Sequence, residues 1–271
     1  MPICEMRGRQ LAFADRLLAQ EDYNLAVLEY QRFLFNFPMD SLATLAKYKL
    51  GLCYMGCEKW DQALKVFKQI TDEEERNKFV EVSLFSSGSC FSRKGEFDLA
   101  RIQYHKVIGE FPRSELADDA QFMLALTYID DCLWLEAADE FMNLPRKFPQ
   151  SPFVPLAERL ALESASGSQL PHRSAVASGI LSAVIPGAGQ VWCGRVADGF
   201  FSLLLTGTFT YFAIKSYQDD KKTSACFLGF LGFSFYTGNI YGAVNSARKY
   251  NSRNVEQFQS RLKMEAASAY K

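Results

Sequence analysis

The residues with the clearest capacity for chemistry in this chain are two neighbouring cysteines. Cys53 and Cys57 lie four residues apart in CYMGC, on one face of a helix, so they could form a redox pair. A Cys-x-x-Cys spacing is absent, and Cys53 stands beside Tyr54, which occupies a packing position. The seven cysteines of the chain show no spacing typical of a disulfide framework, and burial as small apolar residues accounts for most of them. A redox function therefore stays as an alternative.

Other catalytic and metal-binding patterns are not found. The two histidines, His105 and His172, have no cysteine or carboxylate neighbours at the spacing of metal ligands, and they do not support a catalytic triad. The segment GAGQ could suggest a phosphate-binding loop, but no Gly-Lys-Ser/Thr follows it and no strand precedes it. We therefore expect no enzymatic activity, no metal, no cofactor and no small-molecule substrate.

Charge and hydropathy divide the 271 residues into two unlike parts. The formal net charge of −1 offers no basic surface for nucleic acid, so we expect no nucleic-acid partner. Residues 1–166 carry most of the charged side chains, whereas 175–247 is largely apolar. Between them, residues 167–174 are rich in the residue types of linkers. This change in composition predicts two domains.

An internal repeat of 37 residues organises the first domain. Four alanines recur at this interval, each with an aromatic residue three positions earlier and another four positions later. The alanines are Ala26, Ala63, Ala100 and Ala137, the earlier aromatics are Tyr23, Trp60, Phe97 and Trp134, and the later ones are Tyr30, Phe67, Tyr104 and Phe141. Proline stands twelve positions after the alanine in three of the four units, at Pro38, Pro112 and Pro149. This regularity predicts stacked units of one supersecondary structure.

The pattern resembles the tetratricopeptide repeat, a pair of antiparallel helices with small residues at their crossing point. Its first-helix signature, Leu-Gly-x-x-Tyr, is present as Leu50, Gly51 and Tyr54. The usual period of this family is 34, and longer units are similar to those of bacterial envelope assembly lipoproteins. The resemblance implies an all-α solenoid of four units, closed by a capping helix within 151–166.

The same resemblance implies where a partner protein or peptide would bind. In this family the concave groove is lined by side chains of the first helix of each unit. At these positions the chain has Tyr48, Leu52 and Met55 in the second unit, Phe85, Ser89 and Ser92 in the third, and Phe122, Leu126 and Ile129 in the fourth. An apolar groove of this kind suits an amphipathic helix or an extended apolar segment. Alternatively, these side chains pack against the chain's own cap or membrane part.

The second domain has the composition of a membrane domain. Uncharged runs cover 174–194, 199–214 and 223–247, and a span needs about 20 apolar residues. We expect a transmembrane helical hairpin with spans at about 197–214 and 223–245, preceded by an interfacial or re-entrant helix at 175–192. A basic tail, 248–271, would follow.

A glycine-rich motif lies at the entry to this domain. It reads Pro-Gly-x-Gly-Gln-x-aromatic-x-Gly-Arg, and its residues are Pro186, Gly187, Gly189, Gln190, Trp192, Gly194 and Arg195. The motif resembles the turn ahead of the hairpin in small bacterial two-span membrane domains, including uncharacterised proteins that fuse such a domain to tetratricopeptide repeats. The resemblance implies a bilayer partner and a location in the bacterial inner membrane, but no activity.

These observations predict a non-enzymatic, membrane-anchored scaffold that binds a partner protein. The alternatives are an assembly factor that handles the apolar segments of membrane or envelope proteins, and the redox protein described above. Positive charge marks the cytoplasmic side of a membrane. The tail contains Arg248, Lys249, Arg253, Arg261 and Lys263, so a hairpin of two spans predicts a cytoplasmic solenoid, whereas a third crossing by 174–194 would place the solenoid outside.

Overall fold

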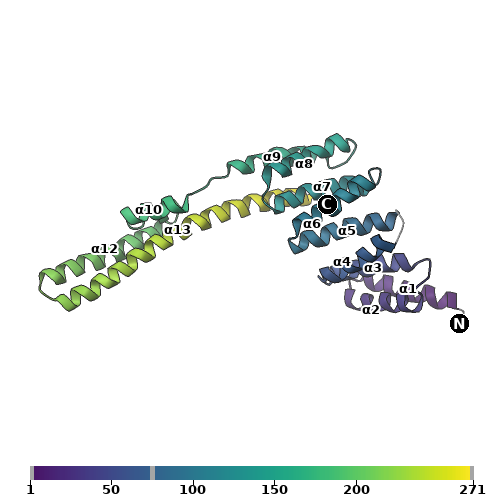
Figure 1. The fold of residues 1–271 in the computed structure, drawn as a ribbon, viewed down its shortest axis with the longest axis horizontal. Helices are drawn as coiled ribbons and strands as arrows, with labels where there is room; N and C mark the ends of the chain where they lie inside the picture. Colours follow the sequence, from purple (N-terminus) through teal and green to yellow (C-terminus); the bar gives the residue numbers. More distant parts are fainter. Residues whose placement is uncertain (1–2, 74–76, 269–271) are drawn as a thin grey trace. The chain divides into compact units, whose positions relative to one another are not determined.

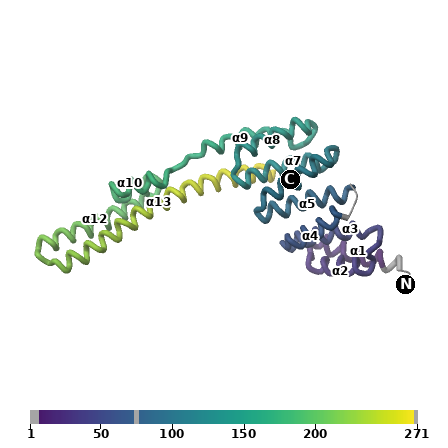
Figure 2. Tube along the Cα trace, viewed as in Figure 1, coloured from purple at the N-terminus to yellow at the C-terminus, as the bar shows by residue number. Residues whose placement is uncertain are grey.

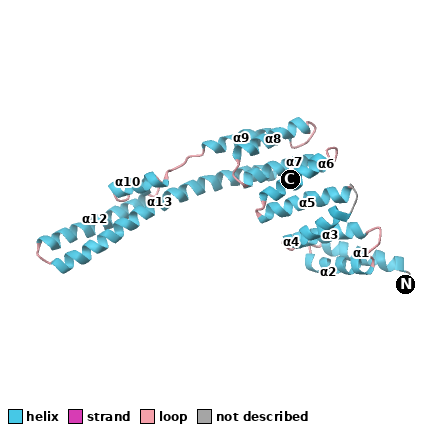
Figure 3. Ribbon diagram, viewed as in Figure 1, coloured by secondary structure: helices cyan, strands magenta, loops and turns pink. Residues whose placement is uncertain are grey.

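The computed structural model describes residues 3–73 and 77–268, and every regular element in that part of the chain is helical (Figure 3). The described residues form two compact units, which we call the solenoid unit and the hairpin unit. The solenoid unit contains the residues up to Ser168 together with those from Leu262 onward, and the hairpin unit contains Gln169–Arg261. The prediction of an all-α fold is confirmed.

Within the described residues, the solenoid unit contains four helix pairs, a ninth helix and the last turns of α13 (Lys222–Ala267). The first helix of each pair, here called helix A, is α1 (Ile3–Ala19), α3 (Ala43–Gly56), α5 (Lys78–Lys94) or α7 (Leu116–Asp130). The second, helix B, is α2 (Tyr23–Asn36), α4 (Trp60–Glu73), α6 (Phe97–Glu110) or α8 (Trp134–Lys147), and α9 (Val154–Ser166) packs against α8 (Figure 1). Each helix B begins at the first aromatic residue of the sequence repeat, so the period of 37 is also the structural period.

The repeated alanines and the later aromatics form the core of the solenoid. All eight of these side chains are fully buried, from Ala26 and Tyr30 in the first pair to Ala137 and Phe141 in the fourth. Gly51 on α3 lies against the ring of Phe67 on α4, and a Cβ atom at this glycine would be 2.3 Å from that ring. A Cβ atom at Gly88 on α5 would likewise lie 2.7 Å from the ring of Tyr104 on α6. A small residue on helix A therefore allows the large ring of helix B to reach the core.

The turn between helices A and B contains a residue with positive φ in every pair. These residues are Glu21, Glu58, Gly95 and Cys132, with φ between 56° and 77°, and they recur every 37 positions. Such left-handed backbone is favourable only for glycine, and it costs other residues roughly 1–2 kcal/mol. Three of the four pairs thus carry local strain that the sequence pattern did not reveal.

A short 3-10 helix, η1 (Gly167–Gln169), includes the last two residues of the solenoid unit before 262 and the first residue of the hairpin unit. The hairpin unit then contains two short helices and a helical hairpin. The short helices are α10 (Ala175–Val184) and α11 (Ala188–Trp192), and the hairpin is formed by α12 (Val196–Gln218) and α13 (Lys222–Ala267), which run side by side (Figures 1 and 2). The rings of Phe209 on α12 and Phe235 on α13 stack with their centroids 5.0 Å apart. The last turns of α13 belong to the solenoid unit.

One helix of the described chain, α12, is long and apolar enough to cross a membrane by its length and composition. The expected second span at 223–245 is not confirmed by this measure, since these residues lie in the 46-residue helix α13, which does not meet the same test of length and composition. Helix α10 is apolar but has only 10 residues, about 15 Å, which is half the thickness of a bilayer core. The segment 175–192 is thus two short helices rather than one.

The strained turns generate a prediction about stability. We expect Glu58→Gly to raise the free energy of unfolding by about 0.5–1 kcal/mol and Gly95→Ala to lower it by about 1 kcal/mol, because only glycine adopts the required backbone without strain. Urea denaturation of the full chain in mild detergent, followed by circular dichroism, measures both changes. Gly109→Ala, at an exposed position inside α6, is the control and should stabilise the chain by up to about 1 kcal/mol. Equal effects of Gly95→Ala and Gly109→Ala would contradict the strain argument.

Candidate functional site

Three of the expected groove residues are half-buried and pack on the rings of helix B. Tyr48 and Leu52 on α3 lie against the core cluster around Phe67, and the ring centroids of Tyr48 and Phe67 are 5.9 Å apart. Phe85 on α5 meets Tyr104 edge to face at 5.7 Å. These side chains therefore support the repeat core and offer only part of their surface to a partner.

Two expected groove residues belong wholly to the core, which corrects the sequence interpretation. Phe122 and Ile129 on α7 have no exposed surface. The ring of Phe122 lies between Phe141 of α8, at 5.5 Å, and Phe153 just before α9, at 5.0 Å. The cap thus covers Phe122, as the alternative of packing against the chain's own cap anticipated.

The remaining two residues, Met55 and Leu126, line a concave cavity of about 1050 Å³ in the solenoid unit. Most of its lining comes from helix A of three successive pairs, including Ser89 and Ser92 on α5. Other lining residues are Trp60, Arg93, Lys94, Phe97, Met123, Asp130 and, from the end of α13, Lys263, Ala266 and Ala267. The cavity therefore combines an apolar floor with charged side chains, whereas the sequence suggested an apolar groove.

The charged lining residues were missed because the sequence analysis followed one stripe of helix A. Arg93 and Lys94 occupy the last turn of α5, and Asp130 is the last residue of α7. Lys94 lies between two acids, with its ammonium nitrogen 2.8 Å from Asp61 and 2.8 Å from Glu96. The sequence contained a signal for these lining residues, because the charges stand at the ends of successive A helices.

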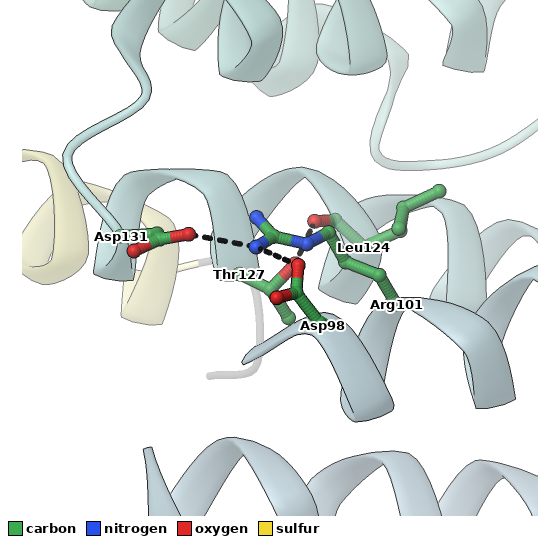
Figure 4. Close-up of polar contacts among 5 residues, drawn as sticks. All are labelled: Asp98, Arg101, Leu124, Thr127 and Asp131. Atoms are coloured by element: carbon green, nitrogen blue, oxygen red, sulfur yellow. Dashed lines mark hydrogen bonds and ion pairs between the residues drawn. The ribbon is translucent and has the colours of Figure 1, made fainter. Parts of the chain in front are cut away.

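An arginine cluster joins α6 to the end of α7 (Figure 4). Arg101 on α6 is 7% exposed, and it donates hydrogen bonds to Asp98, at 2.9 Å, and to Asp131 in the next pair, at 2.7 Å. Its guanidinium carbon lies 4.4 Å from the centroid of the Tyr128 ring. Burial opposes the charge, but the bonds to the two carboxylates outweigh it and raise the pKa of Arg101. The cluster joins the third pair to the fourth, because Arg101 belongs to α6 and Asp131 follows α7. Thr127, in the last turns of α7, donates a hydrogen bond to the Leu124 carbonyl of its own helix.

The two cysteines of CYMGC do not form a reactive pair in the structure. Cys53 is fully buried, and this burial, assisted by Cys57 and Asp15, raises the pKa of its thiol to about 12. Cys57 donates a hydrogen bond from its sulfur to the Asn24 side chain at 3.6 Å. Both are free thiols. A thiol that stays protonated at neutral pH is a poor nucleophile, so the redox alternative gains no support.

The glycines of the PGAGQ motif allow backbone segments of the hairpin unit to touch. Gly187 has φ of 90°, and a Cβ atom on it would lie 2.0 Å from the carbonyl oxygen of Gly199 at the start of α12. A Cβ atom on Gly189 would lie 2.1 Å from the carbonyl oxygen of Ser178 on α10. Residues with side chains would force α10, α11 and α12 apart.

Gln190 is the centre of a buried polar network. Its amide nitrogen donates to the backbone carbonyl of Asn239 at 2.9 Å and to the side-chain oxygen of that residue at 3.1 Å. The hydroxyl of Ser182 donates to the side-chain oxygen of Gln190 at 2.8 Å and accepts from the backbone N–H of Gly189 at 2.9 Å. Asn239 completes the circuit, because its amide donates to the Ser182 carbonyl at 2.9 Å and its oxygen accepts from the Gly187 N–H at 2.8 Å.

The other motif residues lie around this network. Pro186 and Trp192 are half-buried, Gly194 has φ of 80°, and Arg195 is exposed and pairs with Asp198 at 2.5 Å. Ser182 and Asn239, which complete the network, were missed by the sequence analysis. The signal for Asn239 was its position as a strongly polar residue inside an uncharged run of 25 residues.

Comparisons with known proteins agree with the solenoid fold. The model of the tetratricopeptide repeat matches residues 45–74 and 82–114, which cover the second and third helix pairs. A tetratricopeptide repeat protein from Parabacteroides merdae is similar in structure, with a TM-score of 0.51 and 15% identity over 96% of this chain and 99% of that one. No curated protein matches the sequence.

A second structural relative is described as a putative kinesin light chain with nearly identical TPR-like repeats, from Podosopora anserina. It has a TM-score of 0.51 and 14% identity over 62% of this chain and 89% of that one. At these identities the likeness shows the fold alone. Tetratricopeptide repeats generally mediate contacts between proteins, and among the described residues no cluster of three or more metal-ligating side chains occurs.

The buried network generates a prediction for the hairpin unit. Asn239→Leu keeps the approximate size of the side chain but leaves the Gly187 N–H and the Ser182 carbonyl without this partner, while the Gln190 amide keeps its bond to the backbone carbonyl of residue 239. Each unpaired buried group costs about 1–3 kcal/mol, so we expect the variant to open far more often than the wild type. The rate of trypsin cleavage at Arg195 and Lys215 in detergent measures this opening. Ser234→Ala is the control, because its exposed hydroxyl bonds only within α13, to Phe230. Equal cleavage of both variants would contradict a stabilising role for the network.

Proposed function

We propose that the protein is a membrane-anchored scaffold that captures a partner protein in the concave cavity of its solenoid unit. The observation that carries this proposal is the cavity of about 1050 Å³ lined by helix A of three successive pairs. Tetratricopeptide repeats bind proteins on this face, and the lining includes the expected groove residues Met55 and Leu126. The scaffold needs no catalytic group.

The chemistry of the cavity favours an amphipathic helix as the partner segment. Met55, Met123 and Leu126 offer an apolar floor, while Arg93 and Asp130 offer charges of both signs. A helix with an apolar stripe and flanking charges would satisfy both kinds of surface. A second candidate function, the handling of apolar segments during membrane or envelope assembly, is favoured by the two methionines, because flexible thioether side chains adapt to different apolar partners.

Membrane anchoring is supported by the apolar surface of the hairpin unit. Large apolar side chains are exposed along both helices, including Phe200, Phe201, Leu204 and Phe212 on α12 and Phe227, Phe230 and Phe233 on α13. An exposed apolar surface of this extent is unfavourable in water and is typical of contact with lipid. We infer a hairpin of two spans, since α10 and α11 are too short to cross, and the basic residues after the hairpin then favour a cytoplasmic solenoid in a bacterial inner membrane.

The capture proposal predicts the effect of a charge on the cavity floor. A photo-crosslinking amino acid at position 92 should yield adducts with a partner protein in cells, and Leu126→Asp should reduce them at least tenfold, because a carboxylate would be desolvated in the apolar contact. Leu126 is half-buried, so the melting temperature of each variant is measured as well. The matched control, Leu135→Asp, lies on the exposed surface of α8 and should leave the adducts unchanged. Adducts that persist in Leu126→Asp would refute capture at this cavity.

The anchoring proposal predicts resistance to extraction. The full chain should stay with membranes in alkaline carbonate, whereas the triple change Phe227→Lys, Phe230→Lys and Phe233→Lys should release it, since a charge inside the bilayer costs up to about 2.5–3.5 kcal/mol per residue. Immunoblots of the pellet and supernatant provide the measurement. A control with lysine at Leu28, Phe35 and Met39, which are also largely exposed but lie on the solenoid unit, should remain in the pellet. Release of the wild-type chain would overturn the anchor.

A further inference from the structure

The last turns of α13 lie on the concave face of the solenoid unit. Leu262 is 0% exposed and Ala266 is 2% exposed, although the chain around them is polar. These residues are four positions apart, so they form one apolar stripe on the helix. Lys263, Ala266 and Ala267 line the same cavity as Met55 and Leu126.

Charged pairs fix the position of this segment on two helices. The ammonium group of Lys263 pairs with Asp130 at the end of α7, and Glu265 lies 2.6 Å from the guanidinium of Arg159 on α9. The carboxylates of Asp130 and Glu265 are about one-fifth exposed, whereas Lys263 and Arg159 are 48% and 60% exposed, so the pairs set the orientation of the segment more than its stability. The outward residue of the same turn, Met264, is 70% exposed.

The segment is not needed as a cap, because α9 already covers α8 at the end of the stack. It lies instead against the helix A side, where the cavity draws its lining from α3, α5 and α7. A short amphipathic turn with an apolar stripe and paired charges is the kind of ligand that the chemistry of the cavity favours.

We propose that this part of the cavity is a helix-binding site whose resident ligand is residues 262–268 of the same chain. The inference rests on the proposed function and deepens it, since the partner is then a helix with the same pattern. That pattern is a large apolar residue, a small residue four positions later, a cation facing Asp130 and an anion facing Arg159. Because the resident ligand is tethered, its effective concentration is high, and a partner must displace it. The segment therefore inhibits capture of any partner helix that binds the site more weakly than the tethered segment does.

The test uses a fluorescent peptide of residues 252–268 and the full chain in detergent. We expect the double variant Leu262→Asp, Ala266→Asp, which cannot seat its own segment, to bind the peptide at least tenfold more tightly than the wild type. Fluorescence anisotropy measures the affinities. Met264→Asp, on the outward side of the same turn, is the control and should behave as the wild type. Circular dichroism checks that each chain is folded, and the milder variant Lys263→Glu should give an intermediate increase.

Charge reversal tests the recognition itself. A peptide carrying Lys263→Glu should bind the double variant at least tenfold more weakly, and adding Asp130→Lys to that receptor should restore binding. Equal peptide affinities of the wild type and the double variant, absence of peptide binding, or indifference to charge reversal would each overturn the inference. The crosslinking at position 92 reports on partner capture independently. A double variant that binds the peptide but forms no adducts at position 92 would refute the proposed function while supporting the helix-binding site.

Discussion

The solenoid depends on the close approach of helix A and helix B at a small residue. At Gly51 and Gly88 the ring of the facing helix lies where a Cβ atom would be, so no larger side chain fits without moving the helices. The rings that fill this space, Phe67 and Tyr104, are fully buried. Buried alanines, Ala14 and Ala125, occupy the equivalent positions 37 residues before and after, so each pair presents the next with a similar surface and the stack grows by repetition.

This packing also determines which residues remain for binding. Phe122 and Leu126 lie one turn apart on the same face of α7, but the rings of Phe141 and Phe153 cover Phe122, whereas Leu126 lines the cavity. The two positions are close in sequence and both are apolar, but only the second lines the cavity. The cap therefore decides which apolar side chains of α7 remain open to the cavity.

The hairpin unit uses a different principle. Its helices α10, α11 and α13 are joined by a buried circuit of hydrogen bonds among Ser182, Gln190 and Asn239, with glycines at the closest backbone contacts. In apolar surroundings a hydrogen bond is strong and an unpaired polar group is costly, so a closed circuit specifies one arrangement of the helices. The outward surface is then free to be apolar, which is what contact with lipid requires.

The sequence determined the repeat of 37 residues and the apolar character of the second domain, and its resemblance to the tetratricopeptide repeat implied the helical fold. These properties follow from short-range patterns, because a helix buries one face and a repeat copies that face. The tertiary structure alone decided that Phe122 and Ile129 are core residues, that Asn239 is the partner of Gln190, and that Leu262 lies on the concave side. Each of these depends on which distant segment covers a side chain, and spacing along the chain carries no information about that contact.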